Sequence, residues 1–93
     1  MDKVNKIDLK EEAVHGTVKF PLAVYRYAGE GDFTVKLHWH EETEIIYLKK
    51  GRFCIDINMQ KYRINSPALF FVSSGDIHGL YGEKGCEESA VVF

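Results

Sequence analysis

The sequence has few of the features that mark membrane, exported or nucleic-acid-binding chains. Its longest apolar runs, such as residues 68–72, are far shorter than the roughly 20 residues needed to cross a bilayer. Residues 1–15 are charged throughout and lack the apolar segment of a signal peptide. The sequence has twelve Lys and Arg and fourteen Asp and Glu, which gives a net charge of -2. It has no cluster of basic residues that could bind a nucleic-acid phosphate backbone. The sequence therefore indicates a cytoplasmic domain that does not itself bind nucleic acid or membrane.

Cysteines and helical segments are also scarce. Cys54 and Cys86 form no CxxC pair, and in an intracellular setting we expect both thiols to be reduced. No crossover helix lies between the strand-like runs, which excludes a βαβ architecture. Neither a Ser-His-Asp arrangement nor a Gly-rich phosphate loop can be built. What is present is the composition of one compact folded domain, with 93 residues of which 45% are apolar.

After residue 16 the chain consists of short strand-like runs separated by turn residues. The clearest is Phe33–His40, which alternates between an apolar face and a polar face that holds both histidines and Lys36. Further strands are expected over residues 17–28, 43–50, 53–59, 61–64, 68–72, 77–81 and 90–93, with a loop over 82–88. Pro21 places the first of these at a sheet edge or bulge. We predict an all-β antiparallel barrel over residues 16–93, preceded by an N-terminal arm over 1–15.

Three histidines and a glutamate could meet at one point of this barrel. His38 and His40 are two residues apart on a strand, so their rings lie on one face about 7 Å apart. Glu44 follows across a corner, and His78 follows a glycine turn. Such a set suits Mn, Fe, Co, Ni, Cu or Zn, with positions open for water or substrate. The alternative is that the His38 and His40 pair and the glutamates form a solvated surface while His78 bonds to the backbone.

The spacing of these residues resembles the two cupin motifs. Gly31, six residues, His38-Trp39-His40, three residues, Glu44, six residues and Gly51 look like the first motif, with one extra residue after the first glycine. Residues 73–78, Ser-Ser-Gly-Asp-Ile-His, are similar to the second motif, with serine in place of proline. The asparagine usual four residues beyond the last histidine is Gly82 here. The resemblance implies a small jelly-roll barrel.

A narrower resemblance covers nearly the whole chain. It rests on His15-Gly16-Thr17, Phe20-Pro21, Tyr25, His38-Trp39-His40-Glu41-Glu42, Glu44-Ile45-Ile46-Tyr47 and Gly75-Asp76-Ile77-His78. These segments resemble the N-terminal cupin domains of AraC-type transcriptional regulators. The resemblance implies a domain that binds a small effector and forms homodimers, while DNA is bound only by a separate C-terminal helix-turn-helix domain. We expect that domain to be missing here, because residues 91–93 end the chain in an apolar strand.

The cupin resemblance also implies which way side chains point. His38, His40, Glu44 and His78 would face the space between the sheets, as metal ligands or as contacts for a polar effector. Lys36 and Arg63 are further candidate effector contacts. The alternation then places Phe33, Val35, Leu37 and Trp39 outside, where we expect the arm, the 17–27 strand or a second subunit to cover them.

Two functions follow from these expectations. The first, a non-enzyme, is an effector-sensing and dimerisation domain that binds a small polar molecule, such as a sugar, and shifts the arm or the dimer contact. The second is a stand-alone mononuclear metal cupin enzyme, a dioxygenase, isomerase or epimerase, with Zn, Ni, Mn, Fe or Co. The absence of a clear general base near the histidines favours the sensor.

Overall fold

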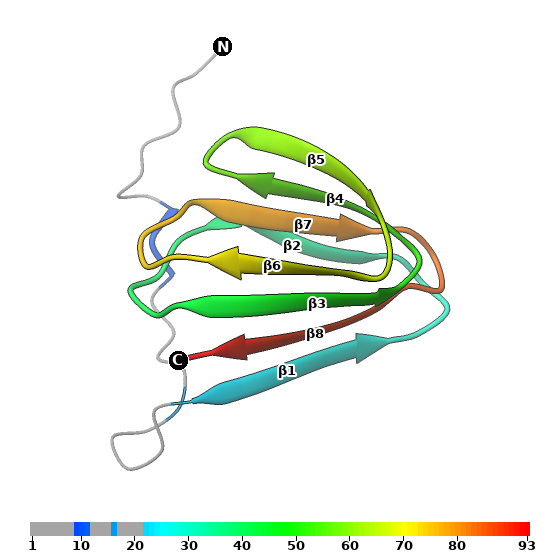
Figure 1. Ribbon diagram of the computed structural model, residues 1–93, viewed down its shortest axis with the longest axis horizontal. Helices are drawn as coiled ribbons and strands as arrows, with labels where there is room; N and C mark the ends of the chain where they lie inside the picture. The colour runs from blue at the N-terminus through cyan, green and yellow to red at the C-terminus, as the bar shows by residue number, and fades with distance from the viewer. Residues whose placement is uncertain (1–8, 12–15, 17–21) are drawn as a thin grey trace.

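The computed structural model describes residues 9–11, 16 and 22–93 and arranges them as two facing antiparallel sheets (Figure 1). One sheet has the order β1-β8-β3-β6 and the other β2-β7-β4-β5. The strands are β1 (Ala23–Ala28), β2 (Phe33–His38), β3 (Glu44–Lys50), β4 (Arg52–Ile57), β5 (Gln60–Asn65), β6 (Ala68–Val72), β7 (His78–Gly82) and β8 (Glu87–Val92). The prediction of an all-β antiparallel fold is confirmed. Most of the predicted arm, and residues 17–21 of the first strand, lie outside the described residues.

The hydrophobic core fills the space between the two sheets. In β3 buried and exposed residues alternate from Glu44 to Lys49, because successive side chains of a strand point to opposite faces. The largest side chains with no solvent exposure are Leu48, Ile55, Val72, Val92 and Cys86. Both sheets contribute to this set, so the core joins them. Cys54 and Cys86 are free thiols, as expected.

An irregularity in β2 corrects one prediction. Val35 pairs with Leu80 and His38 with His78, so three steps along β2 match two along β7. This is a β-bulge, and it shifts the alternation by one residue. Phe33 and Val35 therefore pack against the core, not outside it as predicted, although His38 also faces inward. The extra residue in the first motif accounts for the shift.

Two strand boundaries also differ from expectation. β2 ends at His38 and not at His40, since Trp39 pairs only in an isolated bridge with Lys10. β8 begins at Glu87, inside the predicted loop, because its partners in β1 and β3 extend to that level.

The turn between β3 and β4 requires its glycine. Gly51 has a φ of 101°, and a Cβ there would lie 3.0 Å from Cys86 Cα.

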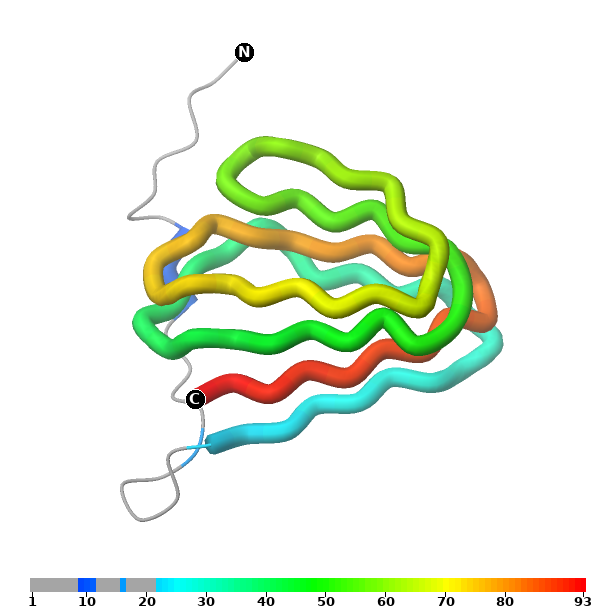
Figure 2. Tube along the Cα trace, in the orientation of Figure 1, coloured from blue at the N-terminus to red at the C-terminus, as the bar shows by residue number. Residues whose placement is uncertain are grey.

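The described part of the arm covers Trp39, one of the coverings predicted. Leu9 O accepts from Trp39 N at 2.9 Å, and Glu11 N donates to Trp39 O at 2.8 Å. Lys10 Nζ lies 5.3 Å from the centre of the Trp39 ring and 3.3 Å from Glu41 Oε1. In Figure 2 this blue segment lies against the end of the barrel where β2 ends and β7 begins.

No helix among the described residues is long and apolar enough to span a membrane.

One carboxyl group is buried in the core without a partner. Glu88 on β8 is 6% exposed, and its Oε1 has no hydrogen-bond partner among the described residues. Burial, and then the charge of Glu44, raise the pKa of Glu88 to about 7. The side chain is therefore neutral in the folded chain at acidic pH and becomes a buried charge above neutrality.

This burial predicts a pH-dependent gain for Glu88→Gln. Because the folded pKa lies above the unfolded one, Glu88 stabilises the fold below about pH 4.5, and that contribution is lost as the pH rises through 7. At pH 8 the glutamine variant should be more stable by on the order of 3 kcal/mol, with little difference at pH 4.5. Urea unfolding at both values measures this. Glu87→Gln, one residue away, is the control, and an equal gain in both variants would contradict the prediction.

Candidate functional site

Four side chains from both sheets meet at one end of the barrel. His38 ends β2 and His78 begins β7, while Glu44 begins β3 in the opposite sheet. His40 lies in the connection between β2 and β3 and is 2% exposed. One ligand atom from each of the four lies within 4.8 Å of all the others. The structure thus brings together all four predicted metal ligands.

Glu44 forms the centre of this cluster. Its Oε1 lies 3.0 Å from His40 Nε2 and 3.1 Å from His78 Nε2. The His38 ring is 4.3 Å from the His78 ring, centroid to centroid. A carboxylate oxygen can only accept, so a hydrogen bond at either contact needs a hydrogen on Nε2, and that hydrogen must leave before Nε2 can bind a metal ion.

The other nitrogen of each imidazole is fixed by the backbone. Nδ1–H of His38 donates to Lys36 O at 2.8 Å, that of His40 to Glu42 O at 2.9 Å and that of His78 to Asp76 O at 2.8 Å. Because a carbonyl oxygen only accepts, Nδ1 carries the hydrogen in all three rings. In the neutral rings Nε2 is then the unprotonated nitrogen, and it faces the cluster. This is the arrangement that orients histidines as metal ligands.

A hydrogen-bonded loop holds His78 in place. Asp76 Oδ2 accepts from Ser73 N at 2.9 Å, and Asp76 Oδ1 accepts from Asn58 Nδ2 at 3.0 Å. Asn58 Oδ1 in turn accepts from Ile77 N at 3.0 Å. Sequence reasoning identified Asp76 only as part of a turn and missed Asn58, which is twenty residues before His78. Side chains that bond to loop backbone are common in turns, so this pattern alone carries little signal.

The second motif also contacts the first through the backbone. Gly75 N donates to His40 O at 2.9 Å, and Gly75 has a φ of 81°, a conformation that favours glycine. The glycine of the second motif therefore fixes the histidine that lies outside the strands.

The protonation of the cluster follows from burial and from mutual contacts. Burial alone would raise the pKa of Glu44, but the hydrogen bonds and charges of His78 and His40 outweigh it and lower that pKa. Burial alone would lower the pKa of His78, but Glu44 and the Asp76 carbonyl raise it above its ordinary value. The pKa of His38 is lowered, chiefly by burial. A proton therefore resides between Glu44 and His78 more readily than on His38.

The arm adds a residue that sequence reasoning did not single out. Glu11 Oε2 lies 3.3 Å from His38 Nε2, and both side chains are largely shielded from solvent. The backbone bonds of Leu9 and Glu11 to Trp39 set this position. No local pattern signals the contact, since Glu11 is one of several charged residues in the arm.

The other two candidate contacts lie elsewhere. Lys36 is exposed, because the bulge places it before the inward-facing His38. Arg63 on β5 pairs with Cys54 on the outer side of its sheet and is exposed. The structure thus joins neither residue to the cluster.

The chemistry of the cluster fits a divalent transition-metal ion. Ligand atoms about 2.1 Å from one ion lie roughly 3 to 4.2 Å apart, close to the spread of these four. In their neutral forms the three imidazoles, together with the one carboxylate, make a mixed N/O ligand set. Four protein ligands leave further positions open on a six-coordinate ion.

Comparison with solved structures identifies the fold. An RmlC-like cupin from Shewanella frigidimarina superposes with a TM-score of 0.68 at 17% identity, covering 76% of this chain and 64% of that one. A predicted oxalate decarboxylase from Thermotoga maritima gives a TM-score of 0.63 at 26% identity, covering 80% and 65%. The chain is a cupin jelly-roll barrel.

Sequence comparison then identifies the family. Residues 20–90 match the AraC-like ligand binding domain. The chain is 29% identical over 82 residues to the HTH-type transcriptional regulator YdeC of Bacillus subtilis strain 168, covering 86% of this chain but 28% of that protein. The chain therefore belongs to the AraC-like ligand binding domain family.

The shared proton predicts an order of titration within the cluster. His38 should lose its proton at a lower pH than His78, and Glu44→Gln should lower the pKa of His78, because burial then acts without the carboxylate. NMR titration of the ring nitrogens measures both values. Glu41→Gln, an exposed neighbour, should leave the pKa of His78 in place. An unchanged pKa in Glu44→Gln would contradict the assignment.

Proposed function

We propose that this chain is the effector-sensing and dimerisation domain of an AraC-type transcriptional regulator. The single observation that carries the proposal is the clustering of three imidazoles and one buried carboxylate, with ligand atoms within 4.8 Å of one another, in a family of ligand-binding domains. The effector is a small polar molecule, such as a sugar, bound at the cluster directly or through an ion. DNA is contacted by a separate domain of the whole protein, and the regulator acts in the cytoplasm.

The cluster residues would hold the ion, from the set Zn, Ni, Mn, Fe or Co. His38, His40 and His78 would ligate through Nε2, while their Nδ1–H bonds keep the rings in orientation. Glu44 would supply the anionic ligand. When bound, such an ion supplies a Lewis acid that can anchor an oxygen of a polar effector.

Occupation of the cluster would change the contact with the arm. In this structure His38 Nε2 faces Glu11 Oε2. An occupant that bonds to His38 competes with Glu11, and the arm is otherwise held near the cluster by the two backbone bonds to Trp39. A ligand shifts an equilibrium only if it contacts the two states differently, and this exchange of partners supplies that difference.

Zinc binding tests the metal part of the proposal. One Zn²⁺ per chain is expected in equilibrium dialysis, and elemental analysis of protein purified without a histidine tag should find bound metal. Affinity should rise between pH 6 and pH 8, because the proton on His78 must leave first.

Matched variants make this test specific. Glu44→Gln and His78→Gln should weaken Zn²⁺ binding about tenfold or more, while Glu30→Gln, in an exposed turn, should not. Amide exchange at Glu11 and Trp39, whose N–H groups donate the two bonds of this pairing, should quicken on binding if the occupant displaces the arm. A metal content near zero in the wild type would reject the ion and leave direct effector binding.

The outer face of the β1-β8-β3-β6 sheet carries exposed apolar side chains. We call the apolar outward side chains of this sheet and of the residue after β8 the apolar face: Val24, Ile45, Tyr47, Leu69, Phe71, Val91 and Phe93. Leu69 is 69% exposed and Phe71 63%, on an edge strand. Patches of this kind mark association sites. We propose that a second copy covers this face.

Replacing Phe71 tests the dimer. Phe71→Lys should give a monomer in sedimentation velocity under conditions where the wild type is a dimer, because a charge would be buried in the interface. Thr34→Lys adds the same charge to the outer face of the other sheet and should leave the dimer intact. A dimer that survives Phe71→Lys, or a wild type that is monomeric, would contradict the proposed surface.

A metal-dependent enzyme is the alternative, and the likeness to the predicted oxalate decarboxylase favours it. Its weakness is that the second carboxyl group beside the cluster, that of Glu11, already pairs with His38. Glu88, the other carboxyl in the core, pairs with Leu48, four residues beyond Glu44 on β3. That separation is roughly 13 Å along the strand, too far to exchange a proton at the cluster.

A further inference from the structure

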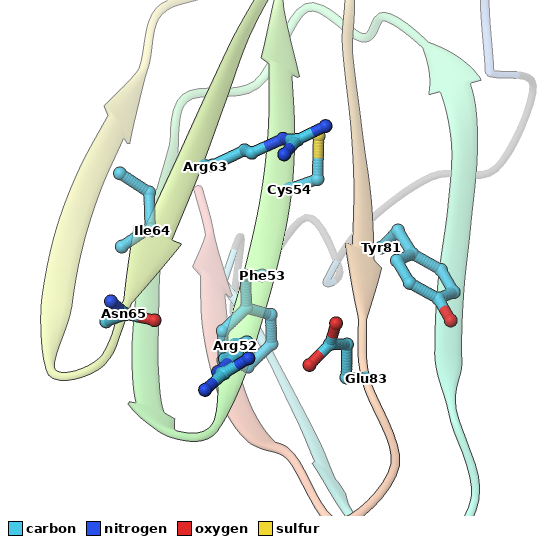
Figure 3. Close-up of a pocket in the computed structure, with 8 residues that line it drawn as sticks. All are labelled: Arg52, Phe53, Cys54, Arg63, Ile64, Asn65, Tyr81 and Glu83. Carbon is cyan, nitrogen blue, oxygen red and sulfur yellow. The ribbon is translucent and has the colours of Figure 1, made fainter.

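A second polar site lies on the outer face of the β2-β7-β4-β5 sheet, away from the cluster. The register places Arg52 opposite Asn65 and places Cys54 between Arg63 and Tyr81. Their side chains point outward, since Phe53 and Ile55 between them are buried in the core. A cavity of about 570 Å³ opens here, lined by Arg52, Phe53, Cys54, Arg63, Ile64, Asn65, Tyr81 and Glu83 (Figure 3). That volume lies in the usual range of small-molecule sites.

Two arginines dominate this cavity. Arg52 and Arg63 are diagonal neighbours across β4 and β5, a relation that places their backbone positions roughly 7–8 Å apart, within reach of two long side chains. Neither guanidinium makes a hydrogen bond or ion pair with any residue in the described part of the chain. Two like charges so placed repel each other, and an anion between them would remove that repulsion.

The rest of the lining narrows the class of anion. Asn65 and Tyr81 offer neutral hydrogen-bond donors, and neither side chain is engaged by a described residue. Glu83 adds one negative charge on the same rim (Figure 3). The lining therefore carries a net charge of about +1, which favours a single carboxylate over a more highly charged phosphate. Guanidinium groups bind carboxylates in a planar, two-pronged geometry.

We propose that this cavity binds small organic monocarboxylates, with Arg52 and Arg63 as the anion-binding residues. The site is independent of the metal and effector cluster, because His78 faces the interior while Arg63 faces outward from the same sheet. An anionic ligand could thus bind with the cluster empty or filled.

Titration with sodium acetate, sodium benzoate and inorganic phosphate tests the proposal. Ionic strength is held constant with sodium chloride, and the Nε–H signals of arginine are followed by NMR. Saturable shifts are expected at Arg52 and Arg63, with benzoate tighter than acetate because its ring fills more of the cavity. Shifts that grow linearly without saturation, or phosphate binding tighter than either carboxylate, would overturn the assignment.

Three variants separate a site from general charge screening. Arg63→Gln should weaken benzoate binding at least fivefold, and Glu83→Gln should strengthen it. Lys61→Gln removes the same charge two residues along β5, on the same outward face but outside the lining, and should have little effect. Equal losses in Lys61→Gln and Arg63→Gln would show that only net charge matters. Unchanged amide spectra elsewhere check that each variant is folded.

Discussion

The contact between Glu44 and the two buried imidazoles joins the two sheets at the end of the barrel where β3 and β7 begin. Glu44 belongs to one sheet and His78 to the other, so this contact joins the two layers where the apolar core gives way to polar groups. Such a buried group needs its partners, because an unpaired charge in the interior is strongly unfavourable. The glycine turn positions His40 and the Asp76 loop positions His78, while the arm contacts the neighbouring His38. Because the buried negative charge of Glu44 needs a positive or hydrogen-bonding partner, the cluster could also hold a cation.

Much of the fold could be predicted from alternation and turns. The eight strands follow the short apolar runs, and the four cluster residues follow from the spacing of the motifs. The bulge in β2 could not be predicted from alternation. The sequence indicates it only by one extra residue in the first motif, and strict alternation assigns Phe33 and Val35 to the wrong face of the strand. Alternation of apolar and polar residues shows which face of a strand each side chain occupies only where the strand pairing is regular.

The contacts from distant segments were beyond sequence reasoning. Glu11 reaches His38 only through the pairing of the arm with Trp39, and Asn58 reaches Asp76 across a hairpin turn. Arg63 shows the opposite error: its chemistry suits a polar ligand, but the register of β5 places it on the outside of the barrel. Residue type indicates what a side chain can bind, while strand register decides which ligand it can reach.

The pairing of the arm with Trp39 has a consequence for how the arm could evolve. Leu9 and Glu11 are held by main-chain bonds that any residue except proline could make. The register of this pairing therefore determines which side chain of the arm lies beside His38, in addition to the side-chain contacts of Lys10 and Glu11. A slip of two residues would put Leu9 where Glu11 now lies, exchanging a charged cover for an apolar one. Insertions or deletions in the arm can change what the site meets without any change in the barrel.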